Sequence, residues 1–302
     1  MENIYSIVEN LLGHDYITVP IEHIDKNGGH GNTLSVKIVL PTWCQANCEF
    51  CFNKVNKELQ VHNLEEFKKN LDKSLHIIQN SMTDRKITLD ITGNEPTFNP
   101  VFLKEVLDII SKYKTDIVDK IVITSNGYHL LDFENLYPID IVNISLHHYD
   151  FQKRKDIFRT SLIPNDDELK ILCQRFNTTA IAVCDETDID FEKFTYNFAE
   201  YAKNIGFKNV RIRTNYLTDG TIFYNSFKDV HIDSHAGLDK KVLDINGYNV
   251  NLYRGIKELT SCVIGPEIVI DDNGLIYLDY YKKYQLSEDD IRVFNNCIFV
   301  KK

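Results

Sequence analysis

The sequence lacks the features that mark secreted, membrane-spanning and fibrous proteins. No apolar run reaches the roughly 18 residues that a membrane-spanning helix needs. The N-terminal segment carries acidic residues where a secretory signal has a basic stretch. Only 13 glycines and 7 prolines occur among 302 residues, which is too few for a fibrous or low-complexity chain. We therefore expect a soluble, cytoplasmic protein that does not contact a membrane.

Positive charge is also in short supply. Lysine and arginine number 34 against 44 aspartates and glutamates, and the formal net charge is −10. This balance makes nucleic acid an unlikely partner, because nucleic-acid binding depends on neutralising phosphates. The hydrophobic share of 43% excludes intrinsic disorder, and the length suffices for one large domain or two smaller ones.

The cysteines do not form an even set, so they make a poor disulfide framework. There are seven, and three of them fall within eight residues. In a reducing compartment, such a cluster is typical of a metal or redox site. The set comprises Cys44, Cys48, Cys51, Cys173, Cys184, Cys262 and Cys297.

Strand-like and helix-like segments alternate from residue 34 onward, which predicts an α/β fold with a parallel sheet. Such a sheet closes as a barrel or stays open and doubly wound, and in both cases functional groups gather at the carboxyl ends of the strands. The predicted strands are 34–40, 86–92, 119–125, 140–145, 178–184 and 208–216, and the predicted helices are 63–82, 99–114, 166–176 and 191–205.

The pattern changes near the C-terminus. After residue 217 come an irregular stretch and short strand candidates, with Asp272-Asn273-Gly274 as a strong hairpin signal between two apolar runs. We predict an N-terminal extension over 1–33, an α/β core over 34–217 and a small β-rich cap over 218–302.

The central motif is C-x3-C-x2-C, formed by Cys44, Cys48 and Cys51 just after the first core strand. Three thiolates on a short loop can ligate a [4Fe–4S] cluster, and the missing fourth cysteine leaves one iron open to a small molecule. The alternative is a structural zinc loop in a non-catalytic metal-binding protein. Zinc needs four ligands, and His30 and His62 lie at no standard spacing from the motif.

The motif resembles the signature of the radical S-adenosylmethionine (SAM) enzymes, including the aromatic Phe50 before the last cysteine. Three further segments resemble family motifs in the same order, each after a predicted strand. These are Thr92 to Pro96, a GGEP-like stretch with Asn94 in place of the second glycine, Thr124 to Gly127, a T-N-G-like element, and Asn143 to His147, a serine-bearing strand end.

The resemblance implies a partial (β/α)6 barrel that holds a [4Fe–4S] cluster and SAM. It implies reductive cleavage of SAM to a 5′-deoxyadenosyl radical, which abstracts hydrogen from a substrate at the barrel mouth. A low-potential flavodoxin or ferredoxin is the implied electron donor. The implied cluster ligands are the three motif cysteines.

The resemblance also implies SAM contacts, although turn, capping and core-packing roles stay open for each of these residues. Glu95 supplies a carboxylate for the SAM ammonium, Phe50 packs near the adenine, and Arg213 binds the SAM carboxylate or an anionic substrate. Arg211 and Arg213 share one strand, and we expect one of the two to point inward. The remaining expected contacts are Gly93, Asn94, Pro96, Ser125, Asn126 and Ser145.

Two residues are candidates for catalysis. His147 or its neighbour His148 lies at the predicted barrel mouth, where it could serve as a proton donor or as a hydrogen-bond partner. Glu267 lies in the segment from Ser261, which resembles the start of a SPASM or twitch extension. Cysteine is missing from the later hairpin position, and only Cys262 and Cys297 remain, so we expect no second cluster.

We expect a small-molecule or nucleotide-like substrate. The alternative within the same enzyme class is a peptide maturase.

Overall fold

Six consecutive parallel strands form the centre of the molecule, as the alternating pattern predicts. They are β2 (Thr33–Leu40), β3 (Lys86–Gly93), β4 (Val118–Ser125), β5 (Ile141–Ser145), β6 (Thr178–Cys184) and β7 (Asn209–Thr214). The computed structural model describes residues 5–6, 8, 16–20, 33–51, 63–184, 190–215, 221–235, 238–254, 263–264, 267–278 and 284–301.

Further strands extend this sheet at both edges. β12 (Glu267–Ile270) pairs in parallel with β2 and carries β13 (Ile276–Tyr277) in a hairpin, and β10 (Tyr248–Tyr253) pairs in parallel with β7. β9 (Leu238–Ile245) and β8 (Asp233–His235) follow as antiparallel strands. The described residues thus form an eleven-stranded sheet in the order β13-β12-β2-β3-β4-β5-β6-β7-β10-β9-β8.

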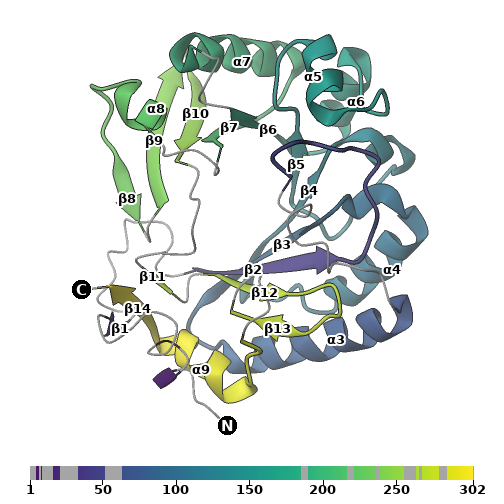
Figure 1. Cartoon of the computed structure of the whole chain (residues 1–302). Coiled ribbons are helices and arrows are strands. Elements are labelled where there is room, and N and C mark those ends of the chain that lie inside the picture. Colours follow the sequence, from purple (N-terminus) through teal and green to yellow (C-terminus); the bar gives the residue numbers. More distant parts are fainter. Residues whose placement is uncertain are drawn as a thin grey trace.

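The sheet curves into an incomplete barrel with its helices on the outside (Figure 1). The strands β2 and β12 lie on one side of the opening, and β7 and β10 lie on the other (Figure 1). This arrangement agrees with the expected partial barrel. No helix in the described part of the chain is long and apolar enough to cross a membrane.

The two faces of the sheet differ in polarity because side chains alternate along each strand. In β2, Leu34, Val36 and Ile38 are fully buried and pack with the helices in one apolar core. Their neighbours on the opposite face are polar, as Lys37 in β2 and Asp90 in β3 show. The inner face of the barrel therefore presents polar side chains, and the outer face packs against the helices in the apolar core.

Several of the outer helices have capping residues at their ends. Asn63 caps α3 (Leu64–Ser81), and Asn99 caps α4 (Pro100–Ser111), which has proline at its first position. Asn165 forms a capping box on α6 (Asp166–Arg175), and Gly206 ends α7 (Phe191–Ile205) in the left-handed conformation. The other described helices are α5 (Phe151–Phe158), α8 (Thr221–Asn225) and α9 (Glu288–Asn296), with short 3-10 turns at Pro96–Phe98 and Tyr128–Asp132.

The C-terminal segments return to the beginning of the sheet. β14 (Cys297–Lys301) pairs with β1 (Tyr16–Pro20) and β11 (Val263–Ile264) in a second, three-stranded sheet. The buried Arg85 donates hydrogen bonds to the carbonyl oxygens of Phe294 and Thr33, which ties α9 to the start of β2. The segments before and after the predicted core are thus bonded to each other and to the barrel.

The hairpin turn between β12 and β13 rests directly on α3. Ser74 and Asn70 donate hydrogen bonds to the carbonyl oxygens of Gly274 and Asn273 at 2.7 and 2.9 Å. A Cβ atom on Gly274 would lie 2.8 Å from the Phe67 carbonyl oxygen, and φ there is +77°. Only glycine fits this close approach.

We predict that Gly274→Ala lowers the free energy of unfolding by about 2 kcal/mol or more, because overpacking against helix backbone adds to the left-handed penalty. Gly247→Ala is the matched control: φ is +75° and nothing lies within 4 Å of the added Cβ. It should cost only the left-handed penalty of about 1 kcal/mol. Urea unfolding of both variants checks this, and equal losses would show that the contact with α3 is unimportant.

Candidate active site

The three motif cysteines lie on a loop at the carboxyl end of β2. Cys44, Cys48 and Cys51 are half-buried and form no disulfide within the described part of the chain. The N–H groups of Ala46 and Asn47 donate, respectively, to the Cys44 sulfur at 3.4 Å and to the Phe158 carbonyl oxygen at 2.8 Å. The loop therefore has a defined shape and is attached to the end of α5.

Glu95 is the hub of the loops that surround this cysteine loop. Its carboxylate is buried, and Oε1 accepts hydrogen bonds from the Thr97 N–H, the Thr97 hydroxyl and the Ser125 hydroxyl at 3.0, 2.6 and 2.7 Å. Oε2 accepts from the Asn126 N–H at 2.7 Å. A buried carboxylate is stable only with such partners, and here they join the loops after β3 and β4.

This arrangement changes the role expected of Glu95. The sequence suggested a carboxylate facing the SAM ammonium, but the described donors turn both oxygens inward. The Glu95 carbonyl oxygen is also engaged, because it accepts from the Thr42 hydroxyl at 2.9 Å. Glu95 thus joins the loops after β2, β3 and β4, and its side chain positions other residues.

Asn126 carries the connection onward to the cysteines. Its Nδ2 donates to the Cys44 sulfur at 3.8 Å, and its Oδ1 accepts from Gln45 at 3.0 Å. Both Ser125 and Asn126 are buried. Two residues that the sequence places beside SAM thus also hold the cysteine loop against β4.

Gly93 and Asn94 bring β3 close to β2. A Cβ on Gly93 would lie 2.7 Å from the Leu40 carbonyl oxygen, and φ is +130°, so no other residue fits. Asn94, which departs from the family motif, donates from Nδ2 to the Thr42 carbonyl oxygen at 2.6 Å. The asparagine therefore adds a bond between the loops that a glycine could not make. Pro96 is buried at the start of the following 3-10 turn.

The cysteine loop fits an iron–sulfur cluster in its chemistry. Burial raises the pKa of Cys44 to about 11, so its proton stays on the thiol until a metal displaces it. The N–H groups aimed at this sulfur would stabilise the thiolate once it forms. Among the described residues, no three His, Cys, Asp or Glu side chains converge closely enough to hold a single metal ion. The thiolates of a [4Fe–4S] cluster bind different irons and need not converge in that way.

His147 lies beside the cysteine loop in a strained conformation. Its φ is +63°, it is buried, and its ring lies 4.8 Å from Phe50 and 5.0 Å from Phe158 between centroids. Nδ1 accepts a hydrogen bond from the Val183 N–H at 3.1 Å, which places the ring proton on Nε2. Burial lowers the pKa of His147 to about 3, so the ring is neutral. With its proton on Nε2, the neutral ring can act as a hydrogen-bond partner at this place.

His148 points elsewhere. Its ring packs on Tyr149 and Phe194 with centroid separations of 4.3 and 5.6 Å, so it contacts α7. Its Nδ1 accepts from the Asp150 N–H at 2.8 Å. Of the two histidines, His147 is therefore the one next to Phe50.

Both arginines of β7 lie on the inner face, which corrects the expectation that only one points inward. Residues two apart on a strand share a face, and the residues of the other face, Val210 before Arg211 and Ile212 between the arginines, are fully buried in the core. Arg211 and Arg213 are exposed. The expectation from the sequence overlooked that residues two apart on a strand point to the same face of the sheet.

Polar residues that the sequence analysis passed over line the inner face. Asn143 is 2% exposed, and its Nδ2 donates to Thr124 at 3.2 Å, while its Oδ1 accepts no hydrogen bond from any described residue. It lies two residues before Ser145 on the same face. A buried amide oxygen without a donor is costly unless a ligand supplies one. Asn143 could have been identified from the sequence, because it is two residues from Ser145 and therefore shares its face of the strand.

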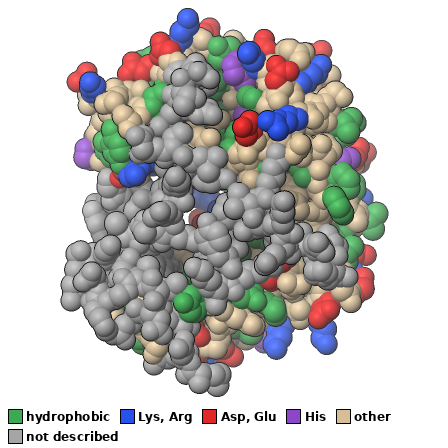
Figure 2. Space-filling view, in the orientation of Figure 1, with side chains coloured by type: hydrophobic (Ala, Val, Ile, Leu, Met, Phe, Trp, Pro, Cys, Tyr) green, Lys and Arg blue, Asp and Glu red, His purple; other side chains and the backbone are tan. Residues whose placement is uncertain are grey.

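Glu267, the second catalytic candidate, belongs to a charged group across β12, β2 and β3. Its carboxylate lies 3.7 Å from the Lys37 ammonium, and Lys37 also pairs with Asp90. The Thr124 hydroxyl donates to Asp90 at 3.4 Å. Figure 2 shows charged side chains at the bottom of a hollow in the middle of one face of the molecule. Glu267 is thus near the barrel interior although it comes from the C-terminal region.

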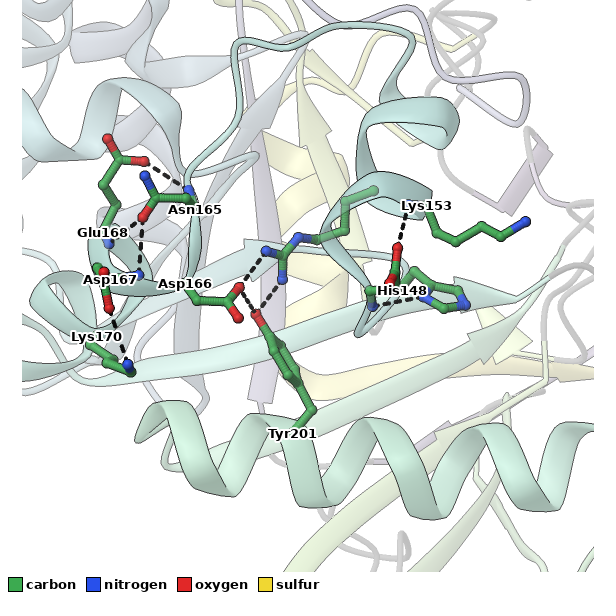
Figure 3. A network of polar contacts seen from close by, with 10 residues as sticks. His148, Lys153, Asn165, Asp166, Asp167, Glu168, Lys170 and Tyr201 are labelled. Carbon is green, nitrogen blue, oxygen red and sulfur yellow. Dashed lines mark hydrogen bonds and ion pairs between the residues drawn. The ribbon is translucent and has the colours of Figure 1, made fainter.

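A buried arginine fixes the helix that holds the cysteine loop. Arg154 in α5 is 1% exposed, bonds Asp166 at 2.7 Å and hydrogen-bonds Tyr201. Asp166 from α6 and Tyr201 from α7 point toward each other at this place (Figure 3). At the far end of α5, Arg159 forms an ion pair with Glu49 of the cysteine loop at 2.9 Å. The end of α5, which Arg154 anchors to α6 and α7, therefore also holds the cysteine loop.

The remaining cysteines that the structure describes are buried. Cys173 and Cys184 are buried, as expected of structural residues. Cys297 is buried, and its Sγ lies 3.4 Å from the Val293 carbonyl oxygen. Cys262 lies outside the described residues.

Comparison with known proteins agrees with the cysteine motif. A family model described as "4Fe-4S single cluster domain" matches residues 29–155. A protein of Methanocaldococcus jannaschii, provisionally named glycyl-radical enzyme activating enzyme, is 31% identical over 130 residues, or 43% of this chain. The match covers 46% of that relative, so the chain spans about half the length of the curated relative it matches.

Solved structures agree in fold. SuiB of Streptococcus suis, bound to the precursor peptide SuiA, has a TM-score of 0.56 at 14% identity over 98% of this chain and 70% of that one. Native anSMEcpe with bound AdoMet and Cp18Cys peptide has a TM-score of 0.54 at 14% identity, over 87% of this chain and 80% of that one. At this identity the likeness shows the fold alone.

These matches support a radical SAM superfamily enzyme. The family model covers the cysteine loop and the GGEP-like segment, and the structural matches extend over both barrel edges.

We predict that Glu95→Gln lowers the free energy of unfolding by about 2–3 kcal/mol, because one buried acceptor becomes an amide N–H group that opposes the donors around it. Glu105→Gln is the control, since its ion pair with Lys68 is exposed and should contribute less than about 1 kcal/mol. Urea unfolding measures both variants. Similar small losses would show that Glu95 is not the hub.

We predict a second effect from His147. Because its folded pKa lies below the unfolded value of 6.5, the unfolded chain binds an extra proton between about pH 6.5 and 3. The stability that the neutral ring provides is complete above pH 6.5 and is lost as the pH falls. His147→Asn keeps a residue that tolerates positive φ. It should lose less stability than the wild type between pH 7 and 5, as measured by urea unfolding.

His76→Gln is the control for this experiment, because His76 is an exposed histidine on α3. It should follow the wild-type pH dependence. If His147→Asn follows it too, the buried neutral ring does not contribute to the acid sensitivity.

Proposed function

We propose that this chain binds a [4Fe–4S] cluster through Cys44, Cys48 and Cys51 and binds SAM beside it. The observation that carries the proposal is the cysteine loop at the carboxyl end of β2, held by Asn126 from one side and Phe158 from the other. When bound and reduced by a low-potential electron donor, the cluster and SAM supply a 5′-deoxyadenosyl radical that abstracts hydrogen from a substrate.

Several residues of the chain would bind SAM, and others hold the binding residues in place. Gly93 and Asn94 form the close backbone approach where the SAM ammonium would bind, and Glu95, Pro96 and Ser125 hold that backbone in place. Phe50 and the neutral His147 form an aromatic wall for the adenine. Ser145 and the unpartnered Asn143 oxygen offer hydrogen bonds from β5.

Arg213 completes the proposed SAM site from across the barrel. It is one residue before the end of β7, where its guanidinium can bind the SAM carboxylate. Glu267 stays a proposed catalytic residue. It shares the Lys37 ammonium with Asp90, so a substrate that displaced the Lys37 contact would free its carboxylate.

We further propose a peptide or protein segment as the substrate. The matching relative is named for activating a glycyl-radical enzyme, and the two solved structures contain peptides. The sequence alone favoured a small-molecule or nucleotide-like substrate, and that is the alternative outcome of a substrate screen. A flavodoxin or ferredoxin in the cytoplasm is the proposed partner for reduction.

We predict that protein purified without oxygen is brown and contains about four irons per chain. With SAM and dithionite it should form 5′-deoxyadenosine. Cys44→Ala, Cys48→Ala and Cys51→Ala should each abolish cluster binding, while Cys173→Ala, a substitution in α6, should leave the iron content unchanged. Iron analysis and chromatography measure these outcomes.

The competing function is a non-catalytic metal-binding protein. A colourless zinc protein that does not cleave SAM would support it and exclude the radical reaction. If Cys173→Ala lost the cluster as fully as Cys44→Ala, the assignment of the ligands would be wrong.

A further inference from the structure

Two positive charges stand without partners on the inner face of β7. The side chains of Arg211 and Arg213 form no ion pair or hydrogen bond with any residue that the structure describes. Arg211 lies in register between Ile181 of β6 and Asn251 of β10, and Arg213 lies between Val183 and Tyr253. The neighbours on either side are thus neutral and offer no carboxylate.

Several other charged groups along the sheet have partners among the described residues. On the opposite side of the opening, Lys37 pairs with both Asp90 and Glu267. Beyond β10, Asp239 pairs with Arg254 and accepts from the Tyr224 hydroxyl, and Asp244 accepts from the Gly247 N–H. These acids are therefore occupied. Lys240 of β9 lies beside Tyr253, with its ammonium 5.8 Å from the centroid of that ring, so the positive charge without a described carboxylate partner extends from β7 to Lys240.

The two arginines lie at different depths. With a rise of about 3.3 Å per residue, their Cα atoms are separated by about 6.6 Å along the strand. Arg213 is one residue from the carboxyl end of β7 and Arg211 is three residues from it. A single carboxylate at the barrel mouth, such as that of SAM, would occupy Arg213 and leave Arg211 facing the space further inside.

We propose that Arg211 binds an anionic side chain of the substrate, so that the enzyme acts on an acidic peptide segment. The proposal rests on the proposed radical SAM function, since it takes SAM as the ligand of Arg213. Guanidinium binds carboxylate through paired, charge-assisted hydrogen bonds, which are strongest where water is excluded. The overall charge of −10 would repel such a peptide, so an unpaired arginine inside the barrel gives it one favourable place.

The test uses the cluster-loaded enzyme with SAM and two labelled nonapeptides. In one, a central glycine is flanked by two glutamates on each side, and in the other these are glutamines. We expect the wild type to bind the glutamate peptide about tenfold more tightly, the size of one charge-assisted contact. Arg211→Gln should remove this preference, and Arg211→Lys should restore part of it. Fluorescence anisotropy measures the affinities.

Lys208→Gln is the matched control, because it removes one exposed positive charge just before β7, at the other end of the strand. It should keep the preference for glutamate. Equal affinity of the wild type for the two peptides, no binding of either, or an equal loss in Lys208→Gln and Arg211→Gln would overturn the proposal.

Measuring the affinity for SAM distinguishes the roles proposed for Arg211 and Arg213. Arg213→Gln should weaken SAM binding about tenfold, and Arg211→Gln should change it less than twofold. If Arg211→Gln weakens SAM binding as much as Arg213→Gln, both belong to the SAM site and the substrate contact is wrong. Failure of the proposed function would look different, because the wild type would then form no 5′-deoxyadenosine with SAM and dithionite.

Discussion

The site depends on the burial of one carboxylate. The buried Glu95 carboxylate needs hydrogen-bond donors, and it receives them from Thr97, Ser125 and Asn126, which belong to two different loops. Its own carbonyl oxygen holds the loop after β2 through Thr42. The ends of three neighbouring strands are therefore set relative to one another by the need to satisfy a single side chain. The position of the cysteine loop therefore depends on the hydrogen bonds that Glu95 makes.

A second support comes from the helices outside the sheet. Arg154 is buried among Phe151, Asp166 and Tyr201, and it fixes α5, whose last residues bind the cysteine loop. The exposed ion pair between Arg159 and Glu49 adds little energy by itself. Together with the Arg154 contacts, it completes a chain of contacts from α7 through α5 to the cysteine loop. The loop is thus held from the β4 side and from the α5 side, and its cysteines stay partly open between these supports.

Much of this could be predicted from the sequence. Alternation of strands and helices gave β6 and α7 with their observed bounds, and the cysteine spacing singled out the loop after β2. Helix α5 was missed because its buried face is centred on Arg154, and apolar periodicity does not detect an arginine. The inward role of Glu95 depends on donors about 30 residues away in the chain, which no local pattern shows. The expectation for the arginines of β7 was wrong because it placed two residues that are two apart on opposite faces of the strand. Their spacing in the sequence was enough to place both on the same face.

The order of the strands has a consequence for how the protein is made. β2, which carries the cysteine loop, has β3 on one side and β12 on the other, and β12 comes from the far end of the chain. The turn after β12 contacts α3 through Asn70 and Asn273, 203 positions apart. A ribosome must therefore translate the chain through β12 before β2 gains both neighbours. Until then the cysteine loop follows an edge strand, so stable cluster insertion would come after β12 has paired.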